Sequence, residues 1–299
     1  MENIPNTPLL REMTLNNERS RRVAEVTLTP PSKTRIITIS NQKGGVGKTT
    51  SAVNLAAALA RKGMGVLVID LDPQGNASTA LGVEHHNSVV GSYEVLVQGV
   101  PMLDAVKQSP EHHNLYCLPA TINLAGAEID MVSVVNRERV LLDSLTQFLA
   151  DFEHPIHFVF IDSPPSLGLL TVNALVAAGE VLVPIQCEYY ALEGLSQLMA
   201  TIRLVRERLN PALEVNGLLL TMLDPRTKLG SDVVREVESH FGDLVYRARV
   251  PRSVRLAEAP SHGIAIRSYA PGTSGAESYA QAAAEFDARV FNGTPVGAS

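Results

Sequence analysis

The sequence predicts an α/β fold, with helices on both faces of a doubly wound, mostly parallel sheet. Short apolar runs rich in β-branched residues alternate with longer segments of helical periodicity, as βαβ crossovers require. A glycine-rich loop at residues 44–47 separates the first apolar run from the first helical segment. The chain has 299 residues, which is long enough for one large domain or two small ones. Its hydrophobic content of 45% and charged content of 19% are typical of a globular protein.

Seven short runs are expected to form the sheet. The clearest is Arg35–Ser40, because its three isoleucines and one threonine suit a buried strand. The remaining expected strands are Val66–Asp70, Leu115–Leu118, His157–Asp162, Val181–Gln186, Val215–Thr221 and Leu244–Val250.

Helical periodicity fills the segments between these runs. The first expected helix, Thr49–Lys62, is rich in alanine and leucine and is stopped by Gly63. The other expected helices are Gly91–Gln98, Asn123–Met131, Arg137–Phe152, Leu167–Ala178, Leu192–Leu209, Asp232–Phe241 and Gly275–Phe291.

The two ends of the chain differ from this pattern. Residues 1–34 are polar and hold four prolines, so we expect a mostly disordered extension with a short helix near Leu10–Val26. They contain no apolar stretch and do not look like a secretory signal. The α/β domain is expected to span residues 35–291, and residues 292–299 to form a frayed tail.

Composition excludes several classes of protein. The sequence has no run of about 18 uncharged apolar residues, so no membrane span is expected. Cys117 and Cys187 are too few for a disulfide framework; they suit a reducing cytoplasm and are expected to pack as small hydrophobic residues. The formal charge of −6 argues against a protein coated in nucleic acid, yet it allows a local basic patch.

The segment Asn41–Thr50 predicts a phosphate-binding loop. A strand leads into it and a helix leaves it, so glycines can turn successive N–H groups inward while the helix start attracts the same anion. Lys48 is expected to reach the β- and γ-phosphates of ATP, and the Thr49 hydroxyl to hold Mg²⁺. The expected nucleotide contacts are Gly44, Gly45, Val46, Gly47, Lys48, Thr49 and Thr50.

Three aspartates follow expected strands. Asp70 and Asp72 end the second strand, and Asp162 ends the run Phe-Val-Phe-Ile. Ligands of open α/β sheets bind at this edge, so Asp162 and Asp70 are expected to help hold Mg²⁺ and Asp72 to orient the attacking water. The alternative is that each aspartate caps a helix or lies in a loop.

The loop also carries a second lysine, Lys43, and Lys-Gly-Gly-Val-Gly-Lys-Thr-Thr resembles the deviant Walker A motif. The chain is similar to the ParA/Soj group of chromosome-partitioning ATPases, a P-loop NTPase family, from Arg35 to about Phe291. The matching stretches are Asn41–Thr50, Asp70–Asn76, Asp162–Ser166, Glu188–Gly194 and Val250–Pro260.

This resemblance implies a nucleotide-driven DNA-segregation cycle. ATP would form a sandwich homodimer in which Lys43 acts on the partner's nucleotide, much as an arginine finger does. The dimer would bind double-stranded DNA without sequence specificity, in a bacterial cytoplasm and on the nucleoid. A ParB-type centromere-binding protein would stimulate slow hydrolysis to ADP and phosphate, which releases the dimer and drives origin or plasmid partitioning.

A DNA surface is expected between residues 224 and 270, which hold eight basic and six acidic residues. Arg226 and Arg255 match the family's DNA-contacting arginines, and Lys228 and Arg247 are further candidates; the alternative is an ordinary solvated face. Contacts to phosphates would make binding salt-sensitive. The resemblance also implies an adenine pocket at Pro251, Arg252 and Met222, although Met222 could equally be core.

Other functions within the superfamily fit less well. A MinD-like membrane ATPase would end in a basic amphipathic helix, whereas Ala282–Phe291 carries two acids and one arginine. An iron–sulfur carrier would need a cysteine pattern that this chain lacks, and a tyrosine kinase a tyrosine-rich tail. Residues 1–34 are too few for an operator-reading domain but could bind a polar scaffold. A protein-cargo-positioning ATPase with the same site chemistry stays open.

Overall fold

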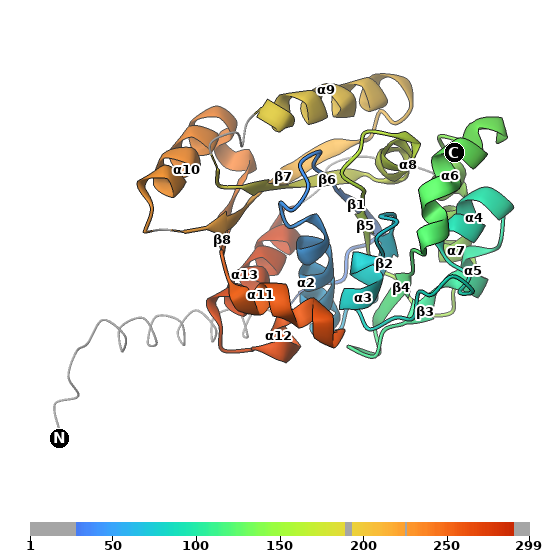
Figure 1. The fold of residues 1–299 in the computed structure, drawn as a ribbon, viewed down its shortest axis with the longest axis horizontal. Coiled ribbons are helices and arrows are strands. Elements are labelled where there is room, and N and C mark those ends of the chain that lie inside the picture. Colours follow the sequence, from blue (N-terminus) through green and yellow to red (C-terminus); the bar gives the residue numbers. More distant parts are fainter. Residues whose placement is uncertain (1–27, 189–192, 225, 290–299) are drawn as a thin grey trace.

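A central sheet organises the computed structural model of the chain, which describes residues 28–188, 193–224 and 226–289. Within these residues the sheet has eight strands in the order β3-β4-β2-β5-β1-β6-β7-β8. All neighbours are parallel except β3 and β4 (Figure 1). The strands are β1 (Arg35–Ile39), β2 (Val66–Asp70), β3 (Lys107–Gln108), β4 (Leu115–Leu118), β5 (Phe158–Asp162), β6 (Glu180–Gln186), β7 (Glu214–Leu223) and β8 (Val245–Pro251).

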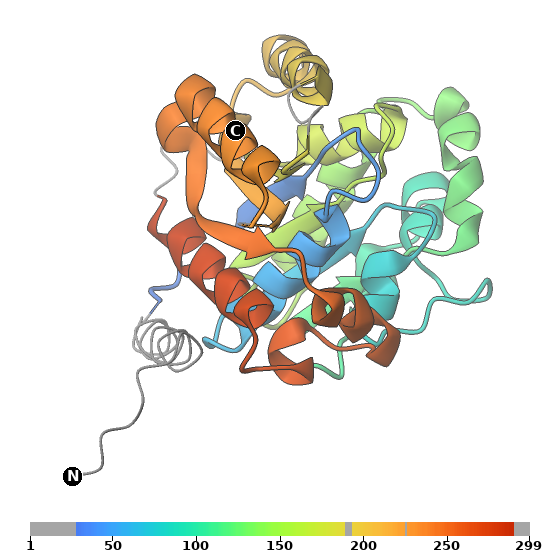
Figure 2. The same cartoon turned by 60° about the vertical axis from the view of Figure 1, so that its left-hand side comes forward.

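Helices cover both faces of this sheet, as Figure 2 also shows. One face is covered by α2 (Lys48–Ala60), α3 (Asn76–Ala80), α11 (Val254–Glu258), α12 (Ile266–Tyr269) and α13 (Ser274–Ala288). The other is covered by α4 (Ser92–Gln98), α5 (Met102–Ala105), α6 (Ala127–Asp130), α7 (Val140–Asp151), α8 (Leu169–Ala177), α9 (Glu193–Arg208) and α10 (Lys228–Phe241).

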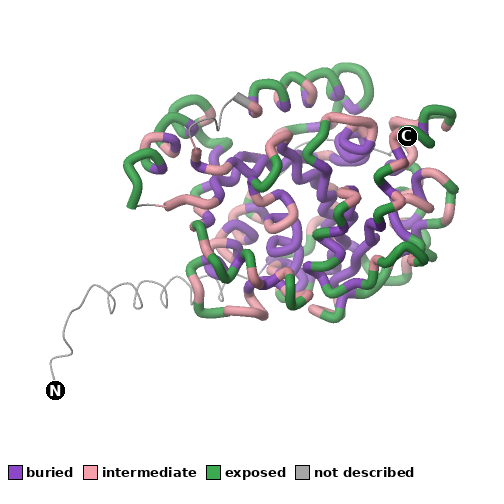
Figure 3. Tube along the Cα trace, viewed as in Figure 1, coloured by how far each residue is buried: buried purple, intermediate pink, exposed green. Residues whose placement is uncertain are grey.

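Strand alternation creates the two cores. In β2, Val66 and Val68 pack on the α2 side while Leu67 and Ile69 pack on the α8 side, and all four are fully buried. A strand covered on both faces therefore reads as an unbroken apolar run. Figure 3 shows the buried residues concentrated along the strands and the inner faces of the helices.

The doubly wound α/β fold expected from the sequence is confirmed, and each expected strand has a counterpart. The single helix expected over Asn123–Met131 is wrong. The chain there forms a 3₁₀ turn (Ile122–Gly126), the four-residue α6 and a second 3₁₀ turn (Met131–Ser133). Helix α10 begins at Lys228 instead of Asp232, because Thr227 accepts a hydrogen bond from the Gly230 N–H and acts as the N-cap.

Short elements were not expected at all. They are the antiparallel edge strand β3, the helices α3, α5, α11 and α12, and the 3₁₀ turns Gly242–Leu244 and Ala259–His262. Segments of two to five residues are too short to show a periodicity, so tertiary contacts decide them.

The expected domain limits stay predictions. The helix expected near Leu10–Val26 and the tail at residues 292–299 lie outside the described residues. Leu28 is buried in the α2-side core, and the Thr34 hydroxyl donates to the Ile156 carbonyl at 2.6 Å, so residues before position 35 also pack against the domain. Across the described part of the chain, no helix combines the length and the apolar character needed to cross a membrane.

Candidate ATP and magnesium site

The loop between β1 and α2 lies at the carboxyl edge of the sheet, where β1 sits between β5 and β6. Gly45 and Gly47 have φ angles of 74° and 90°, a left-handed backbone that side chains disfavour. Gly47 is the residue directly before α2, so the unpaired N–H groups of the first helical turn face the loop. This is the geometry of an anion cradle.

Lys48 reaches back across the loop. Its side chain is largely buried, and its Nζ donates to the Lys43 carbonyl at 3.3 Å. Burial lowers the pKa of the Lys48 ammonium, and the carboxylates of Asp162 and Asp72 partly offset that effect. The loop therefore holds a cation that is poorly solvated and that an anionic ligand would stabilise.

Asp162 and Thr49 form the second part of the site. The Thr49 hydroxyl donates to Oδ2 of Asp162 at 2.6 Å, which joins α2 to the end of β5. Asp162 is fully buried, and its Oδ1 has no hydrogen-bond partner among the described residues. An unpaired buried carboxylate oxygen is costly unless a cation or a water neutralises it.

Asp70 lies opposite Asp162 in the parallel register of β2 and β5. Burial, with the charge of Asp70 beside it, raises the pKa of Asp162 well above its usual range. Burial likewise raises the pKa of Asp70 to about 6. Thr49 and Asp162 thus place hard oxygen atoms side by side, with Asp70 opposite Asp162 on the neighbouring strand, which fits Mg²⁺.

Asp70 is already hydrogen-bonded. Its Oδ2 accepts from the Ser78 N–H at 2.9 Å and from the Ser78 hydroxyl at 2.7 Å, and its Oδ1 accepts from the Asp72 N–H at 3.2 Å. These contacts fix the turn that presents Asp72. The role expected for Asp70 beside Mg²⁺ stays a prediction, and Asp162 is the aspartate with an oxygen left to offer.

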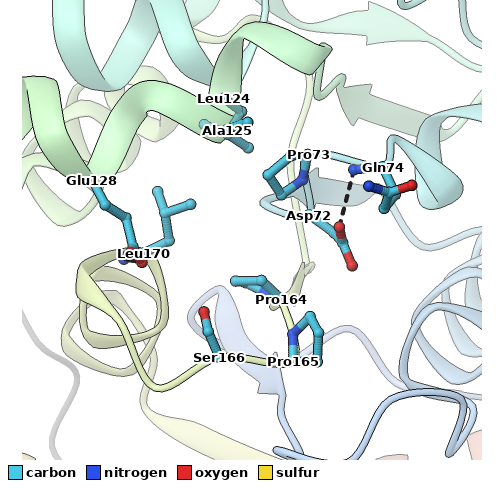
Figure 4. A pocket seen from close by; sticks show the side chains of 10 residues that line it. All are labelled: Asp72, Pro73, Gln74, Leu124, Ala125, Glu128, Pro164, Pro165, Ser166 and Leu170. Carbon is cyan, nitrogen blue, oxygen red and sulfur yellow. Dashed lines mark hydrogen bonds between the residues drawn. The ribbon is translucent and has the colours of Figure 1, made fainter.

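Asp72 borders a pocket of about 390 Å³, which is lined by residues that follow β2 and β5 and by α6 and α8. Figure 4 shows Asp72 and Gln74 on one side of the opening, Glu128 and Leu170 on the other, and Pro164–Ser166 below. Among the described residues, the Asp72 carboxylate accepts one hydrogen bond, from the Gln74 N–H at 3.0 Å, so most of it is free for a water. Across the pocket, Glu128 accepts the Leu170 N–H at 3.3 Å and so caps α8.

Lys43 is held within its own chain. Its Nζ donates to Glu188 Oε2 at 3.1 Å, and the other Glu188 oxygen lies 3.6 Å from an Arg252 nitrogen. All three side chains are partly exposed. Glu188 therefore joins two residues that the sequence analysis expected at the nucleotide. It also opens the Glu188–Gly194 stretch that resembles the ParA/Soj group. Residues 189–192 of that stretch are outside the described residues.

The ends of β7 and β8 meet beside the loop. Leu223 pairs with Pro251, and the Arg252 N–H donates to the Leu223 carbonyl at 3.1 Å. Met222 has a φ of 52°, which is unusual for a residue with a side chain, and is half-buried. Met222, Pro251 and Arg252 thus lie at the ends of two neighbouring strands, and their role as base contacts stays a prediction.

The expected DNA residues are all exposed. Arg226 makes a two-pronged contact with Asp224, at 2.9 and 2.8 Å, and this contact lowers the pKa of Asp224 to about 2. Arg255 pairs with Glu258 at 3.0 Å. Lys228 and Arg247 have no ion pair with another described residue. Surface pairs of this kind are worth little, so a phosphate can replace the carboxylate.

Sequence reasoning missed four residues that shape the site. They are Ser78, Glu128, Glu188 and Thr221. Glu188 follows the end of β6 at the carboxyl edge and could have been found from that position. Glu128 and Thr221 act through contacts between elements far apart in the sequence, whereas Ser78 contacts Asp70 across the turn between β2 and α3.

Comparisons with known proteins agree on one family. A family model described as an AAA domain matches residues 34–215. The sporulation initiation inhibitor protein Soj of Bacillus subtilis (strain 168) is 51% identical over 251 residues, which cover 84% of this chain and 97% of that protein. The chromosome partitioning protein ParA of Myxococcus xanthus is 50% identical over 245 residues, covering 82% and 85%.

Solved structures support the fold. The cobyrinic acid a,c-diamide synthase of Mycobacterium smegmatis, with bound ADP and magnesium, has a TM-score of 0.72 and 36% identity over 84% of this chain and 93% of that one. The septum site-determining protein MinD of Pyrococcus horikoshii, complexed with Mg-ADP, has a TM-score of 0.66 at 24% identity over 84% and 95%, which shows a shared fold.

Proposed function

The chain belongs to the Soj/ParA family of chromosome-partitioning ATPases, and we propose that it is the ATP-driven, DNA-binding dimer of a partition system. Its substrate is ATP with Mg²⁺, and its cycle alternates between a DNA-bound dimer and a free subunit. Mg·ADP in the structures of M. smegmatis and P. horikoshii proteins of the same fold supports the choice of nucleotide and metal.

The single observation that carries the proposal is the buried Asp162 carboxylate. One oxygen is bonded to Thr49 at 2.6 Å and the other has no described partner, at the foot of a glycine-rich anion cradle. Thr49 and Asp162 would hold the metal, with Asp70 behind them, and the bound metal would supply positive charge to the phosphates. Gly44, Gly45, Val46, Gly47, Lys48, Thr49 and Thr50 contribute the loop contacts to ATP.

Hydrolysis depends on a placed water and on fixed cations. The Asp72 carboxylate accepts a single hydrogen bond from the described residues, so it can accept another from the attacking water. Lys48 stabilises the negative charge that develops on the phosphoryl group. Lys43 adds a second cation from the partner subunit, which makes efficient hydrolysis a property of the dimer.

The residues proposed to contact the adenine and the partner subunit lie at the same carboxyl edge of the sheet. Met222, Pro251 and Arg252 surround the adenine. A Cβ built on Gly44 meets no atom of another described residue within 4 Å, apart from its neighbours in the chain. The loop at Gly44 is therefore free to lie against a second copy, with the two nucleotides between the subunits.

DNA binding uses Arg226, Arg255, Lys228 and Arg247. All four are exposed, and they contact phosphates, so the affinity falls steeply with salt and does not depend on sequence. A dimer presents two such surfaces, which couples DNA affinity to bound ATP. A ParB-type partner at the centromere stimulates hydrolysis and releases the protein from the nucleoid. Residues 1–34 lie before the ATPase domain, residues 35–291, and could bind a polar scaffold.

Steady-state hydrolysis tests the proposal. The basal rate is expected to be low and to rise severalfold when random double-stranded DNA and the ParB-type protein of the same genome are added together. A rate that neither addition changes would contradict the partition cycle while leaving the ATPase assignment intact.

A further inference from the structure

Thr221 touches the phosphate loop from outside. It lies near the end of β7 and is almost fully buried, and its hydroxyl donates to the Val46 carbonyl at 2.8 Å. Its methyl carbon lies 3.7 Å from the position that a Cβ on Gly47 would occupy. Thr221 and Val46 are 175 positions apart, so the contact exists only in the folded chain.

The contact fixes the orientation of one peptide group. In a trans peptide the C=O and the following N–H point in opposite directions. The described chain has no cis peptide bonds. When the Thr221 hydroxyl holds the Val46 carbonyl outward, the N–H of Gly47 must point to the opposite side, into the loop. That N–H is one of the donors that a phosphate would meet.

The loop needs such a constraint. Gly45 and Gly47 flank Val46 with left-handed backbones, and glycine rotates freely between conformations. A flip of the Val46–Gly47 peptide changes ψ of Val46 and φ of Gly47. Because glycine accepts either sign of φ, the flip costs little, and it would aim the Val46 carbonyl oxygen at the phosphates. The oxygen would repel the anion, so an unconstrained loop binds nucleotide poorly.

We propose that Thr221 is a positioning residue for ATP: its hydroxyl locks the Val46–Gly47 peptide so that the Gly47 N–H faces the phosphates. The inference rests on the proposed nucleotide site. It adds a residue from β7, far from the loop in sequence, to the groups that determine ATP affinity.

Thr38 offers a matched control. It is also fully buried in the sheet, on β1, and its hydroxyl donates to a backbone carbonyl, that of Ala174 in α8, at 2.7 Å. Thr38→Val and Thr221→Val each remove one buried hydroxyl and keep the shape of the side chain. Each should lower the unfolding midpoint by a similar amount. Only the Thr221 change alters the phosphate loop.

The experiment measures the Kd for Mg·ATP, and KM and kcat for hydrolysis, in the full-length wild type, Thr221→Val, Thr221→Ser and Thr38→Val. The Kd and KM of Thr221→Val are expected to rise about tenfold, which is the effect of one hydrogen bond. The kcat should be nearly unchanged, because the Gly47 N–H contacts the phosphates both in the bound complex and in the transition state. Thr221→Ser and Thr38→Val should keep the wild-type Kd. If Thr221→Val does not fold, Thr221→Ala replaces it with the same expected values.

The outcomes separate this inference from the proposed function. A wild-type Kd in Thr221→Val, or an equal rise in Thr38→Val, would overturn the positioning role while wild-type ATP binding stands. A wild-type protein that does not bind Mg·ATP would overturn the site itself and the inference with it.

Discussion

The Lys43 ammonium lies 3.1 Å from the Glu188 carboxylate of its own chain. Lys43 is the residue expected to act on the nucleotide of a partner subunit, so in a single chain it is held by a local counter-charge. The two side chains are 40% and 45% exposed, and a pair of this kind contributes at most about 1 kcal/mol. Dimerisation can therefore exchange this contact for a phosphate at little cost.

Glu188→Gln is predicted to favour the ATP-bound dimer. Removing the counter-charge frees Lys43, so the dimer should form at a lower protein concentration, by up to about fivefold for each pair released. Analytical ultracentrifugation with ATP measures this shift. Glu138→Gln, which removes the similarly exposed carboxylate paired with Arg137, serves as control and should leave the dimer unchanged. A weaker dimer in Glu188→Gln would show that Glu188 supports the interface instead.

Asp72→Ala is predicted to bind ATP and to accumulate as a dimer. The carboxylate that orients the water is lost, while Lys48, Thr49 and Asp162 keep their contacts, so hydrolysis should fall at least a hundredfold. Single-turnover hydrolysis and size-exclusion chromatography with ATP test both parts. Turnover at the wild-type rate would rule out the role assigned to Asp72.

Gly44→Val is predicted to separate binding from dimerisation. In the described part of the chain, no atom beyond the two neighbouring residues lies within 4 Å of the added Cβ. Gly44 is also not among the glycines with positive φ, so a single subunit should fold and bind ATP normally. The valine side chain would collide with a facing subunit. Calorimetric ATP binding near the wild-type Kd, without ATP-dependent dimers, is expected. A stable ATP-bound dimer of this variant would count against a sandwich at this loop.

Asp162→Asn is predicted to stabilise the nucleotide-free protein at pH 7.5. It is also predicted to abolish the rise in unfolding midpoint that Mg·ATP causes in the wild type. Burial raises the pKa of Asp162 and of Asp70 above the ordinary value of 3.8. Between that value and the raised pKa values, the folded chain therefore holds more protons than the unfolded chain. Wild-type stability should thus fall as pH rises from about 4 through the raised pKa values, with the full cost present above them. The asparagine removes one of the two buried charges.

Thermal unfolding at pH 4, 6 and 7.5, with and without Mg·ATP, measures this effect. The variant should melt a few degrees higher than the wild type at pH 7.5, at about 2–4 °C per kcal/mol for a domain of this size. The difference should shrink toward pH 4, where both carboxyls are protonated. A lower midpoint at pH 7.5 without nucleotide would contradict the unpaired buried charge.

The sequence predicted the parts of the molecule that depend on local pattern. The apolar runs before Asp70 and Asp162, and the glycines of the loop, reveal strands and a phosphate site because strand burial and left-handed turns restrict residue type. The single helix predicted over Asn123–Met131 was wrong. Leu124, Ala127 and Met131 have helical spacing, but the backbone there forms two 3₁₀ turns and the four-residue α6 between them.

Contacts between distant elements could not be predicted in this way. The hydrogen bonds of Thr221 to the Val46 carbonyl, of the Ala120 N–H to Ser78 and of the Leu170 N–H to Glu128 involve common polar residues whose local sequence carries no distinctive pattern. Each depends on how strands and helices pack in three dimensions. The carboxylate partners of Arg226 and Arg255 lie close in sequence, but their geometry depends on the turn before α10 and on the short helix α11.

Binding to random double-stranded DNA, with ATP or ADP and at low and high salt, tests the DNA-segregation function most directly. The wild type is compared with Arg226→Glu/Arg255→Glu and with Arg203→Glu/Arg206→Glu, which makes the same change in charge on the exposed side of α9. ATP-dependent, salt-sensitive binding that is lost only in the first variant is the predicted result. No binding by the wild type in either nucleotide state would contradict a DNA-segregation ATPase and favour the positioning of a protein cargo.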